Sequence, residues 1–270
     1  MPAFICSTCG TQYPPSESAP ATCPICTDER QFVPVSGQSW TTLEGLRNTH
    51  SNKIRRLAAG LTTIETTPAF AINQRAMLAQ TGAGNVLWDC IALIDDATID
   101  LLKGFGGVTA IAISHPHYYT TMVEWSRALG GVPIYLHAAD REWVMRPDSA
   151  VQFWEGDTKP IGPGVTLVRL GGHFAGGTVL HWADWGEGRG VVLSGDILQV
   201  VPSRHVSFMW SYPNLIPLSA AKVRRIADIL EPFAFDAVYG AFSGRGQIDR
   251  DGKAVVAASV ARYIARISEA

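Results

Sequence analysis

The sequence predicts an α/β protein, in which a layered domain with sheets inside and helices outside follows a small cysteine-rich module. Four of the five cysteines lie within the first 26 residues. After Gly60 the chain changes to short apolar runs, separated by glycine and proline, which later alternate with helical patterns. We place the cysteine-rich module and its linker at residues 1–37 and the layered domain at residues 38–270.

The composition excludes several classes of protein. With 270 residues, 47% of them apolar and 17% charged, the chain can bury a large core and is not expected to be disordered. The net charge is −2 without any Lys/Arg run, so we expect neither nucleic acid nor a membrane as a partner. No signal-peptide pattern or membrane-length apolar segment is present. We therefore expect a cytoplasmic protein, and the sequence leaves a homo-oligomer open.

The cysteines form two pairs, Cys6-x-x-Cys9 and Cys23-x-x-Cys26, separated by 13 residues. Each pair can fold as a tight turn whose backbone amides point at the sulfurs, and two such turns complete a tetrahedral thiolate cage. The segment between the pairs is rich in Pro, Ser and Gly and cannot bury a core, so a metal would supply much of the folding free energy. The alternatives are two disulfides or four unrelated thiols.

The cysteine pattern does not identify which metal the cysteine-rich module holds. CSTCGTQYP and CPIC resemble both zinc ribbons and the iron-binding rubredoxin knuckles, including the short version found in rubrerythrins. Zinc and iron both accept four tetrahedral sulfurs, so the ligands do not discriminate between them. We favour a structural zinc ion and keep iron as the alternative.

The elements of the chain follow from apolar periodicity and from chain-breaking residues. Residues 32–37 indicate a linker, because Pro34 and Gly37 break regular structure, and residues 39–47 indicate one or two helical turns. Apolar side chains recur on one helical face at 119–129, 219–230 and 253–267. Short runs rich in Val, Ile and Leu predict buried strands at Leu61–Thr66, Phe70–Ile72, Ala76–Gln80, Val86–Cys90, Val108–Ile113, Val132–Leu136, Val165–Leu170, Thr178–Trp182, Gly190–Leu193 and Ala237–Tyr239.

Three polar clusters in the large domain each follow directly after a predicted strand. Strand ends are where layered α/β folds collect their chemistry, because loops there carry polar groups on a rigid frame. Three imidazoles with one open position are a catalytic zinc pattern, which lowers the pKa of bound water towards ~7. The clusters are SHPH at residues 114–117, GGH at 171–173 and SGD at 194–196.

In this order, SHPH, GGHFAGG and LSGDIL resemble the motifs of the metallo-β-lactamase superfamily, whose members are mostly metal-dependent hydrolases. VLWDC near residue 88 resembles the strand before the first active-site loop, and PIYLHAADREW resembles the segment after the histidine motif. The resemblance runs from about residue 60 to the C-terminus and implies a four-layer αββα sandwich. It also implies that His115, His117 and His173 form the first metal site, with Asp196 as the carboxylate that bridges two metals.

The sequence departs from the family at the second metal site. The family motif is H-x-H-x-D-H, but Tyr119 and Thr120 stand where its Asp and third His would be, and Phe242 stands at or near its last histidine. A phenol, with a pKa of ~10, is a poor ligand for divalent cations, and Phe cannot ligate at all. We therefore expect one mononuclear centre that holds zinc or iron. The sequence leaves open whether Asp196 is its fourth ligand or a base for bound water.

The candidate catalytic residues are Asp196, Tyr119 and His205. His205 lies nine residues after Asp196, in a loop that could fold over the site, and could replace a ligand or act as an acid or base. Tyr119 could bind substrate oxygens. Together these residues favour an enzyme: a hydrolase that activates water at a His₃(Asp) centre on a small ester, thioester, lactone or phosphodiester.

Two other classes of protein are compatible with the same residues. In one, the cysteine-rich module holds iron and exchanges electrons with an iron centre at the histidines. In the other, the loss of the second-site ligands leaves a non-catalytic sandwich that senses a ligand or binds a protein.

Overall fold

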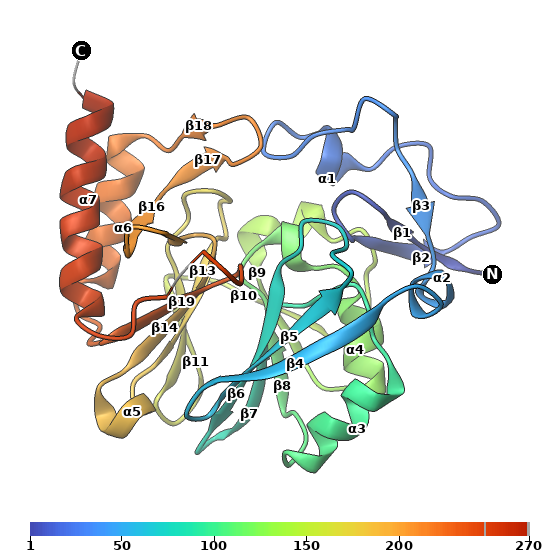
Figure 1. The fold of residues 1–270 in the computed structure, drawn as a ribbon, viewed down its shortest axis with the longest axis horizontal. Helices are drawn as coiled ribbons and strands as arrows, with labels where there is room; N and C mark the ends of the chain where they lie inside the picture. Colours follow the sequence, from blue (N-terminus) through green and yellow to red (C-terminus); the bar gives the residue numbers. More distant parts are fainter. Residues whose placement is uncertain (246, 269–270) are drawn as a thin grey trace.

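The computed structural model describes residues 1–245 and 247–268. Two β-sheets pack face to face, and helices cover both outer faces (Figure 1). The first sheet has the strand order β10-β9-β8-β7-β6-β5-β4, and the second has the order β11-β12-β13-β14-β19. This four-layer αββα architecture confirms the fold class that the sequence predicts.

The first sheet is antiparallel from β4 to β7 and parallel from β7 to β10. The second sheet is antiparallel except for the pairing of β14 with β19. The strands of the first sheet are β4 (Ser51–Ala58), β5 (Leu61–Thr67), β6 (Arg75–Thr81), β7 (Gly84–Trp88), β8 (Ala110–Ala112), β9 (Ile134–His137) and β10 (Val151–Trp154). Those of the second are β11 (Thr158–Gly162), β12 (Val165–Arg169), β13 (Thr178–Trp182), β14 (Val191–Gly195) and β19 (Ala237–Gly240).

Successive side chains of a strand point to opposite faces, so the first sheet has a separate core on each face. Met77 and Trp88 belong to the core between the two sheets, whereas Leu78 and Leu87 pack in the core on the helical side. Because both faces are buried there, residues 86–88 of β7 and all of β8 are apolar. This is why the sequence shows continuous apolar runs rather than an alternation of apolar and polar residues.

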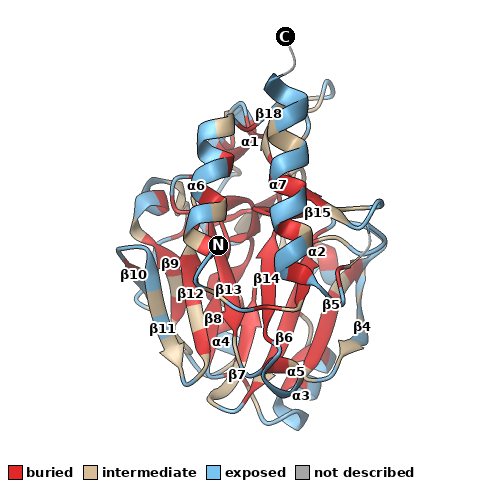
Figure 2. Ribbon diagram, turned by 90° about the vertical axis from the view of Figure 1, so that its left-hand side faces the viewer, coloured by how far each residue is buried: buried red, intermediate tan, exposed pale blue. Residues whose placement is uncertain are grey.

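The helices lie on the outer faces of the sheets. α3 (Asp96–Gly104) and α4 (Met122–Ala128) contribute to the core of the first sheet, and α6 (Ala220–Leu230) and α7 (Gly252–Ser268) to that of the second. Figure 2 shows buried residues concentrated in the sheets and exposed residues on the outer sides of α6 and α7. Within the described residues, no helix is both long and apolar enough to cross a membrane.

The cysteine-rich module folds around a three-stranded sheet of order β2-β1-β3. Its third strand lies beyond residue 37, where we placed the end of the module, so this sheet joins the two sides of that boundary. The elements are β1 (Ala3–Cys6), β2 (Gln12–Pro15), α1 (Pro24–Thr27) and β3 (Trp40–Thr41), followed by α2 (Leu43–Arg47).

Several short elements complete the chain. They are the 3-10 segments η1 (Pro116–Tyr118) and η2 (Ala138–Trp143), α5 (Trp185–Gly188), β15 (Gln199–Val201), β16 (His205–Ser207), β17 (Met209–Ser211) and β18 (Ile216–Pro217). The hairpin of β17 and β18 lies next to the cysteine-rich module (Figure 1), where the Asn214 side chain donates to the Glu29 carbonyl at 2.8 Å.

Two sequence expectations about local structure are wrong. Phe70–Ile72 is not a strand, because the segment turns, with positive φ angles of 53° at Ala71 and 59° at Asn73. The helix expected at 119–129 is regular only over Met122–Ala128, because the chain before it forms the 3-10 turn η1. The helix α3, which Asp95 caps by accepting from the Thr98 N–H at 2.7 Å, was not expected.

Candidate metal centres

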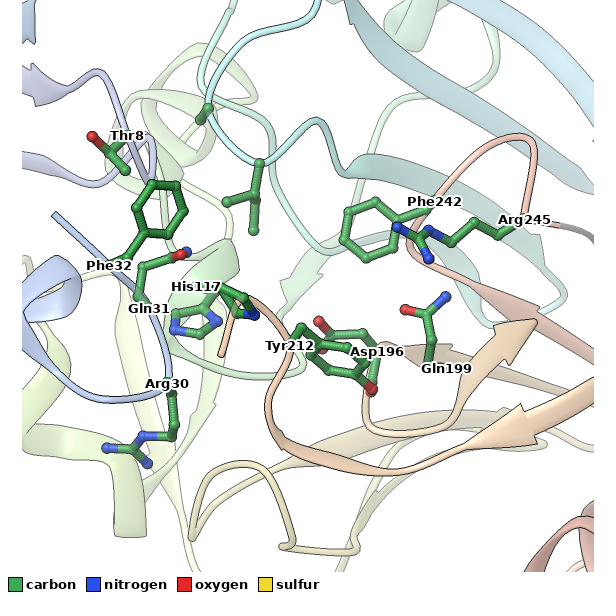
Figure 3. A pocket seen from close by; sticks show the side chains of 13 residues that line it. Thr8, Arg30, Gln31, Phe32, His117, Asp196, Gln199, Tyr212, Phe242 and Arg245 are labelled. Carbon is green, nitrogen blue, oxygen red and sulfur yellow. The ribbon is translucent and has the colours of Figure 1, made fainter. Parts of the chain in front are cut away.

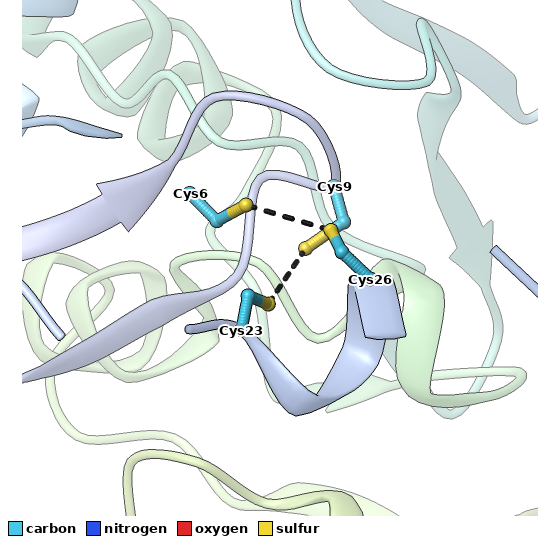
Figure 4. A group of neighbouring side chains, drawn as sticks. All are labelled: Cys6, Cys9, Cys23 and Cys26. Atoms are coloured by element: carbon cyan, nitrogen blue, oxygen red, sulfur yellow. Dashed lines mark hydrogen bonds between the residues drawn. The ribbon is translucent and has the colours of Figure 1, made fainter. Parts of the chain in front are cut away.

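The four cysteines of the module converge on one point (Figure 4). Their sulfurs all lie within 4.8 Å of one another, and the Cys6–Cys26 and Cys9–Cys23 pairs are both 3.6 Å apart. A disulfide needs a separation of about 2.05 Å, and all four thiols are free. Ligands at a Zn–S distance of about 2.3 Å in a tetrahedron lie about 3.8 Å apart. The four sulfurs therefore fit a tetrahedral metal site and do not fit two disulfides.

Burial favours a cation at this cluster. All four side chains are buried, and four thiolates cannot share a dry volume without a compensating positive charge. Hydrogen bonding to Cys23 is the main influence on two of the thiols: it lowers the pKa of Cys6 and raises that of Cys26 above its usual range. A divalent cation can take the place of the protons that these sulfurs would otherwise share.

The three predicted histidines also converge, although they come from distant parts of the chain. His115 and His117 lie after β8, His173 lies in the loop between β12 and β13, and Asp196 directly follows β14. The distance from His173 Nε2 to His117 Nδ1 is 3.3 Å, and that from His115 Nε2 to Asp196 Oδ1 is also 3.3 Å. Tetrahedral ligands at about 2.0–2.1 Å from a metal lie about 3.3–3.4 Å apart. The three imidazoles, whose ligand atoms all lie within 4.8 Å of one another, therefore fit one metal ion, and Asp196 lies beside His115.

Hydrogen bonds fix which nitrogen of two of these rings is free to bind. His173 Nδ1 donates to the Trp210 carbonyl at 2.6 Å, which leaves the lone pair on Nε2. His115 Nδ1 pairs with the Ser114 hydroxyl at 3.0 Å, which directs His115 Nε2 toward Asp196. The buried atoms His115 Nε2 and Asp196 Oδ1 have no hydrogen-bond partner. Such atoms are costly in a folded protein, and a bound cation would satisfy both.

Desolvation keeps the three imidazoles neutral. Burial lowers the pKa of His115 and His117 well below the ordinary value and lowers that of His173 to about 4. Neutral imidazole is the form that binds metals. Burial acts in the opposite direction on the carboxyl group and raises the pKa of Asp196 to about 7.

Asp89 anchors the histidine loop and was missed at the sequence level. Its Oδ1 accepts from the backbone N–H of Ser114 at 2.7 Å, directly before His115, and the Ser114 carbonyl accepts from the N–H of Thr178 in the second sheet at 2.8 Å. The fit is tight, because a Cβ at Gly195 would lie 2.6 Å from the Ser114 hydroxyl. The available signal was the acidic residue that ends the strand in VLWDC.

Asp89→Ala is expected to lower the free energy of unfolding by about 1–3 kcal/mol, because it leaves the buried Ser114 N–H without an acceptor. Asp89→Asn keeps an acceptor oxygen in the same place and should retain most of that stability. Chemical denaturation of both variants tests this. Equal losses would show that the shape of the side chain, rather than the accepted hydrogen bond, is what stabilises the loop.

Of the two adjacent tyrosines, Tyr118 and not Tyr119 lies at the metal centre. The Tyr118 ring is 4.4 Å from that of His115, and its hydroxyl lies beside the Asp196 carboxyl group. Tyr119 is buried in the core on the helical side, a core to which the Tyr118 ring also belongs. The reason is the 3-10 turn at Pro116–Tyr118, in which successive side chains point in directions about 120° apart.

The structure does not bring His205 to the metal centre either. The chain after Asp196 forms the hairpin of β15 and β16, in which His205 pairs with Val201. This hairpin packs on α7, where the Ser259 hydroxyl accepts from the Val206 N–H at 3.0 Å. His205 is partly exposed, and its Nδ1 donates to the Ser203 carbonyl at 2.9 Å. The loop that we expected to fold over the site instead forms a hairpin that packs against α7.

A cavity of about 370 Å³ opens onto the histidine centre. His117, Asp196 and Tyr212 lie on one side of it, and Gln31 and Phe32 of the cysteine-rich module lie on another (Figure 3). Phe242, which the sequence resemblance puts at or near the last family histidine, also lines it. The two metal-ligand clusters therefore belong to one structural unit, in which the first supports a wall of the cavity above the second.

Solved structures with low sequence identity share the fold of the large domain. The structure resembles the mono-zinc form of the metallo-β-lactamase FIM-1 from Pseudomonas aeruginosa with a TM-score of 0.59 and 14% identity, over 81% of this chain and 97% of that one. It resembles the metallo-β-lactamase DIM-1 with a TM-score of 0.60 and 12% identity, over 81% of this chain and 99% of that one. The large domain thus has the metallo-β-lactamase fold.

The sequence comparison places the chain more closely. It is 48% identical over 267 residues to the uncharacterized protein YmaE of Bacillus subtilis (strain 168), which covers 98% of this chain and 96% of YmaE. The chain therefore belongs to the same family as YmaE. No family model matches it.

Proposed function

We propose that this protein is a mononuclear metal-dependent hydrolase with a structural zinc ion in its cysteine-rich module. The observation that carries the proposal is the convergence of His115 Nε2, His117 Nδ1 and His173 Nε2 beside Asp196, with 3.3 Å between paired donors, at the edge of a cavity. The volume of about 370 Å³ suits a small molecule. Substrates of the expected chemistry are small esters, thioesters, lactones and phosphodiesters.

The residues around the cavity have different roles in the proposed hydrolysis. A divalent cation held by the imidazoles would act as a Lewis acid toward the substrate and acidify a water molecule. The Asp196 carboxylate lies at the cavity wall and accepts the proton of the attacking water. Tyr212 holds this residue in place, because its hydroxyl donates to the Asp196 carbonyl at 2.5 Å.

The ring of Tyr118 supports the choice of one metal rather than two. It fills the volume beside Asp196 with a buried phenol, whose pKa burial raises well above the ordinary value. A neutral phenol is a poor cation ligand but can donate a hydrogen bond to the Asp196 carboxylate. The same position therefore disfavours a second metal and orients the proposed base.

Asp196→Asn distinguishes a base from a metal ligand. If Asp196 is the base, the variant retains its metal while kcat for an active ester or phosphodiester falls by about 10²–10⁴-fold. Metal content by mass spectrometry and turnover in a broad substrate panel measure both properties. Loss of the histidine-site metal in this variant would instead make Asp196 a ligand. Wild-type protein that is metal-loaded but turns over no substrate of these classes would count against the hydrolase proposal.

A further inference from the structure

The segment 28–32, which follows the second cysteine pair, runs directly along the histidine pocket. It is tied to the turn that carries the cysteines, because the Asp28 N–H donates to the Pro24 carbonyl at 3.2 Å and the Gln31 N–H donates to the Asp28 carbonyl at 3.0 Å. Arg30, Gln31 and Phe32 line the same cavity as His117, and the Arg30 guanidinium points away from that imidazole (Figure 3). The conformation of the cysteine turn therefore determines where Arg30 lies.

Arg30 connects this segment to the backbone of His173. Two nitrogens of its guanidinium donate to the Asp28 carboxylate, Nε to Oδ1 at 2.6 Å and Nη2 to Oδ2 at 2.9 Å. The remaining nitrogen, Nη1, donates to the His173 carbonyl at 3.4 Å. The guanidinium also stacks on Phe174, with 3.8 Å from its carbon to the ring centroid, and the residue is only 8% exposed. An arginine buried in this way has little freedom to move.

A second connection reaches the imidazole ring of the same histidine. His173 Nδ1 donates to the Trp210 carbonyl at 2.6 Å, and Trp210 Nε1 donates to the Glu29 carboxylate at 3.0 Å. The Asn214 side chain adds a bond to the Glu29 carbonyl at 2.8 Å. The cysteine-rich module thus bonds the backbone of His173 directly through Arg30, and it reaches the ring indirectly, through the bond of Glu29 to Trp210.

We propose that Arg30 is a positioning residue for His173, through which the folded four-cysteine site sets the metal affinity of the histidine centre. The proposal rests on the proposed function only in taking His173 as a metal ligand. Groups that orient a ligating histidine commonly change metal affinity by about 10–100-fold. The cysteine-rich module has no large core of its own, so without its metal the segment that carries Arg30 would lose its shape.

The test compares Arg30→Met with Arg146→Met. Arg146 is a matched control because it is also buried and also joins the cysteine-rich module to the large domain. It bonds Gln12 and the Glu124 carboxylate, far in sequence from the His173 loop. Full-length protein with zinc in the cysteine site is depleted at the histidines and titrated with Co²⁺ against a competing chelator. The visible absorption bands of bound Co²⁺ report the ligand geometry.

Arg30→Met is expected to bind Co²⁺ at the histidines about 10–100-fold more weakly than wild type and to shift its absorption bands. Arg30→Lys should not restore wild-type behaviour, because lysine cannot form the planar two-sided contact with Asp28 and His173. Arg146→Met should keep the wild-type Co²⁺ affinity and spectrum. Trp210→Phe, which removes the bond to Glu29 but keeps an aromatic ring, should shift the bands in the same direction as Arg30→Met.

Wild-type affinity and an unshifted spectrum in both Arg30→Met and Trp210→Phe would overturn the positioning role and leave the proposed function standing. Equal weakening by Arg30→Met and Arg146→Met would also overturn it, because docking of the module in general would then be responsible. A wild-type protein whose histidines bind no Co²⁺ would overturn the proposed function together with this inference.

Discussion

His173→Ala is expected to remove one metal ion per chain and to abolish hydrolysis. His173 faces His117 at 3.3 Å through the nitrogen that its bond to Trp210 leaves free, and alanine removes this donor. A catalytic metal held by three imidazoles is not expected to stay bound on two. Elemental analysis of protein purified without chelators measures the loss, and turnover of the best panel substrate measures its consequence.

The matched control is His205→Ala. His205 is another histidine of the same half of the chain, but its ring donates to the Ser203 carbonyl in a partly exposed hairpin. We expect this variant to keep the wild-type metal content and turnover. An unchanged metal count in His173→Ala would contradict the assignment of the centre. A lost metal in His205→Ala would show that the β15–β16 hairpin reaches the centre in solution.

Cys23→Ser is expected to unfold the cysteine-rich module and to release its metal. Structural zinc sites of this kind contribute about 10–16 kcal/mol of apparent binding free energy, which for a unit with little core is folding free energy. The variant should lose one metal per chain and become sensitive to proteolysis within residues 1–37. Limited proteolysis with mass spectrometry of the fragments, alongside elemental analysis, tests both effects.

Cys90→Ala is the control for the cysteine variant. Cys90 is buried among apolar side chains on the helical side of the first sheet, and burial raises the pKa of its thiol well above the ordinary value. It behaves as a small apolar residue, so its loss should leave the metal content unchanged. A module that stays folded and protease-resistant in Cys23→Ser would mean that its own packing, rather than a metal, stabilises it.

The sequence was sufficient to predict the layered fold and the convergence of two residue groups that could hold a metal, because both leave local patterns. A strand buried on both faces must be apolar, as Val191 to Leu193 are, and three of the predicted runs end in a polar cluster. The cysteine pairs are close in sequence, and their spacing alone predicts a shared site. The order of the family motifs predicted that His173 and Asp196 join His115 and His117, although these residues are distant along the chain.

Side-chain direction in irregular segments could not be predicted in the same way. Tyr118 and Tyr119 are adjacent, and only the 3-10 turn determines that the first faces Asp196 while the second enters the core. The short separation of His205 from Asp196 suggested that His205 could reach the site. In the structure, however, His205 lies in a hairpin that packs on α7. Such outcomes depend on tertiary packing, which sequence spacing does not record.

The contacts of Arg30 could not be predicted from the sequence either. It lies in a segment without apolar periodicity, and its partners Asp28, His173 and Phe174 are on both sides of the boundary between the two parts of the chain. Asp89 left a clearer trace, as a carboxylate at the end of a buried strand. A buried charged residue that joins two loops becomes recognisable only when the fold shows both loops together.

We propose that one chain holds two separate metal ions, one among four cysteines and one among three histidines. Anomalous X-ray scattering from crystals of the metal-replete protein, collected on both sides of the zinc and iron absorption edges, tests it most directly. We expect one peak between Cys6, Cys9, Cys23 and Cys26 at the zinc edge, and a second peak between His115, His117 and His173. Absence of density between the histidines, with the cysteine site fully occupied, would contradict the account.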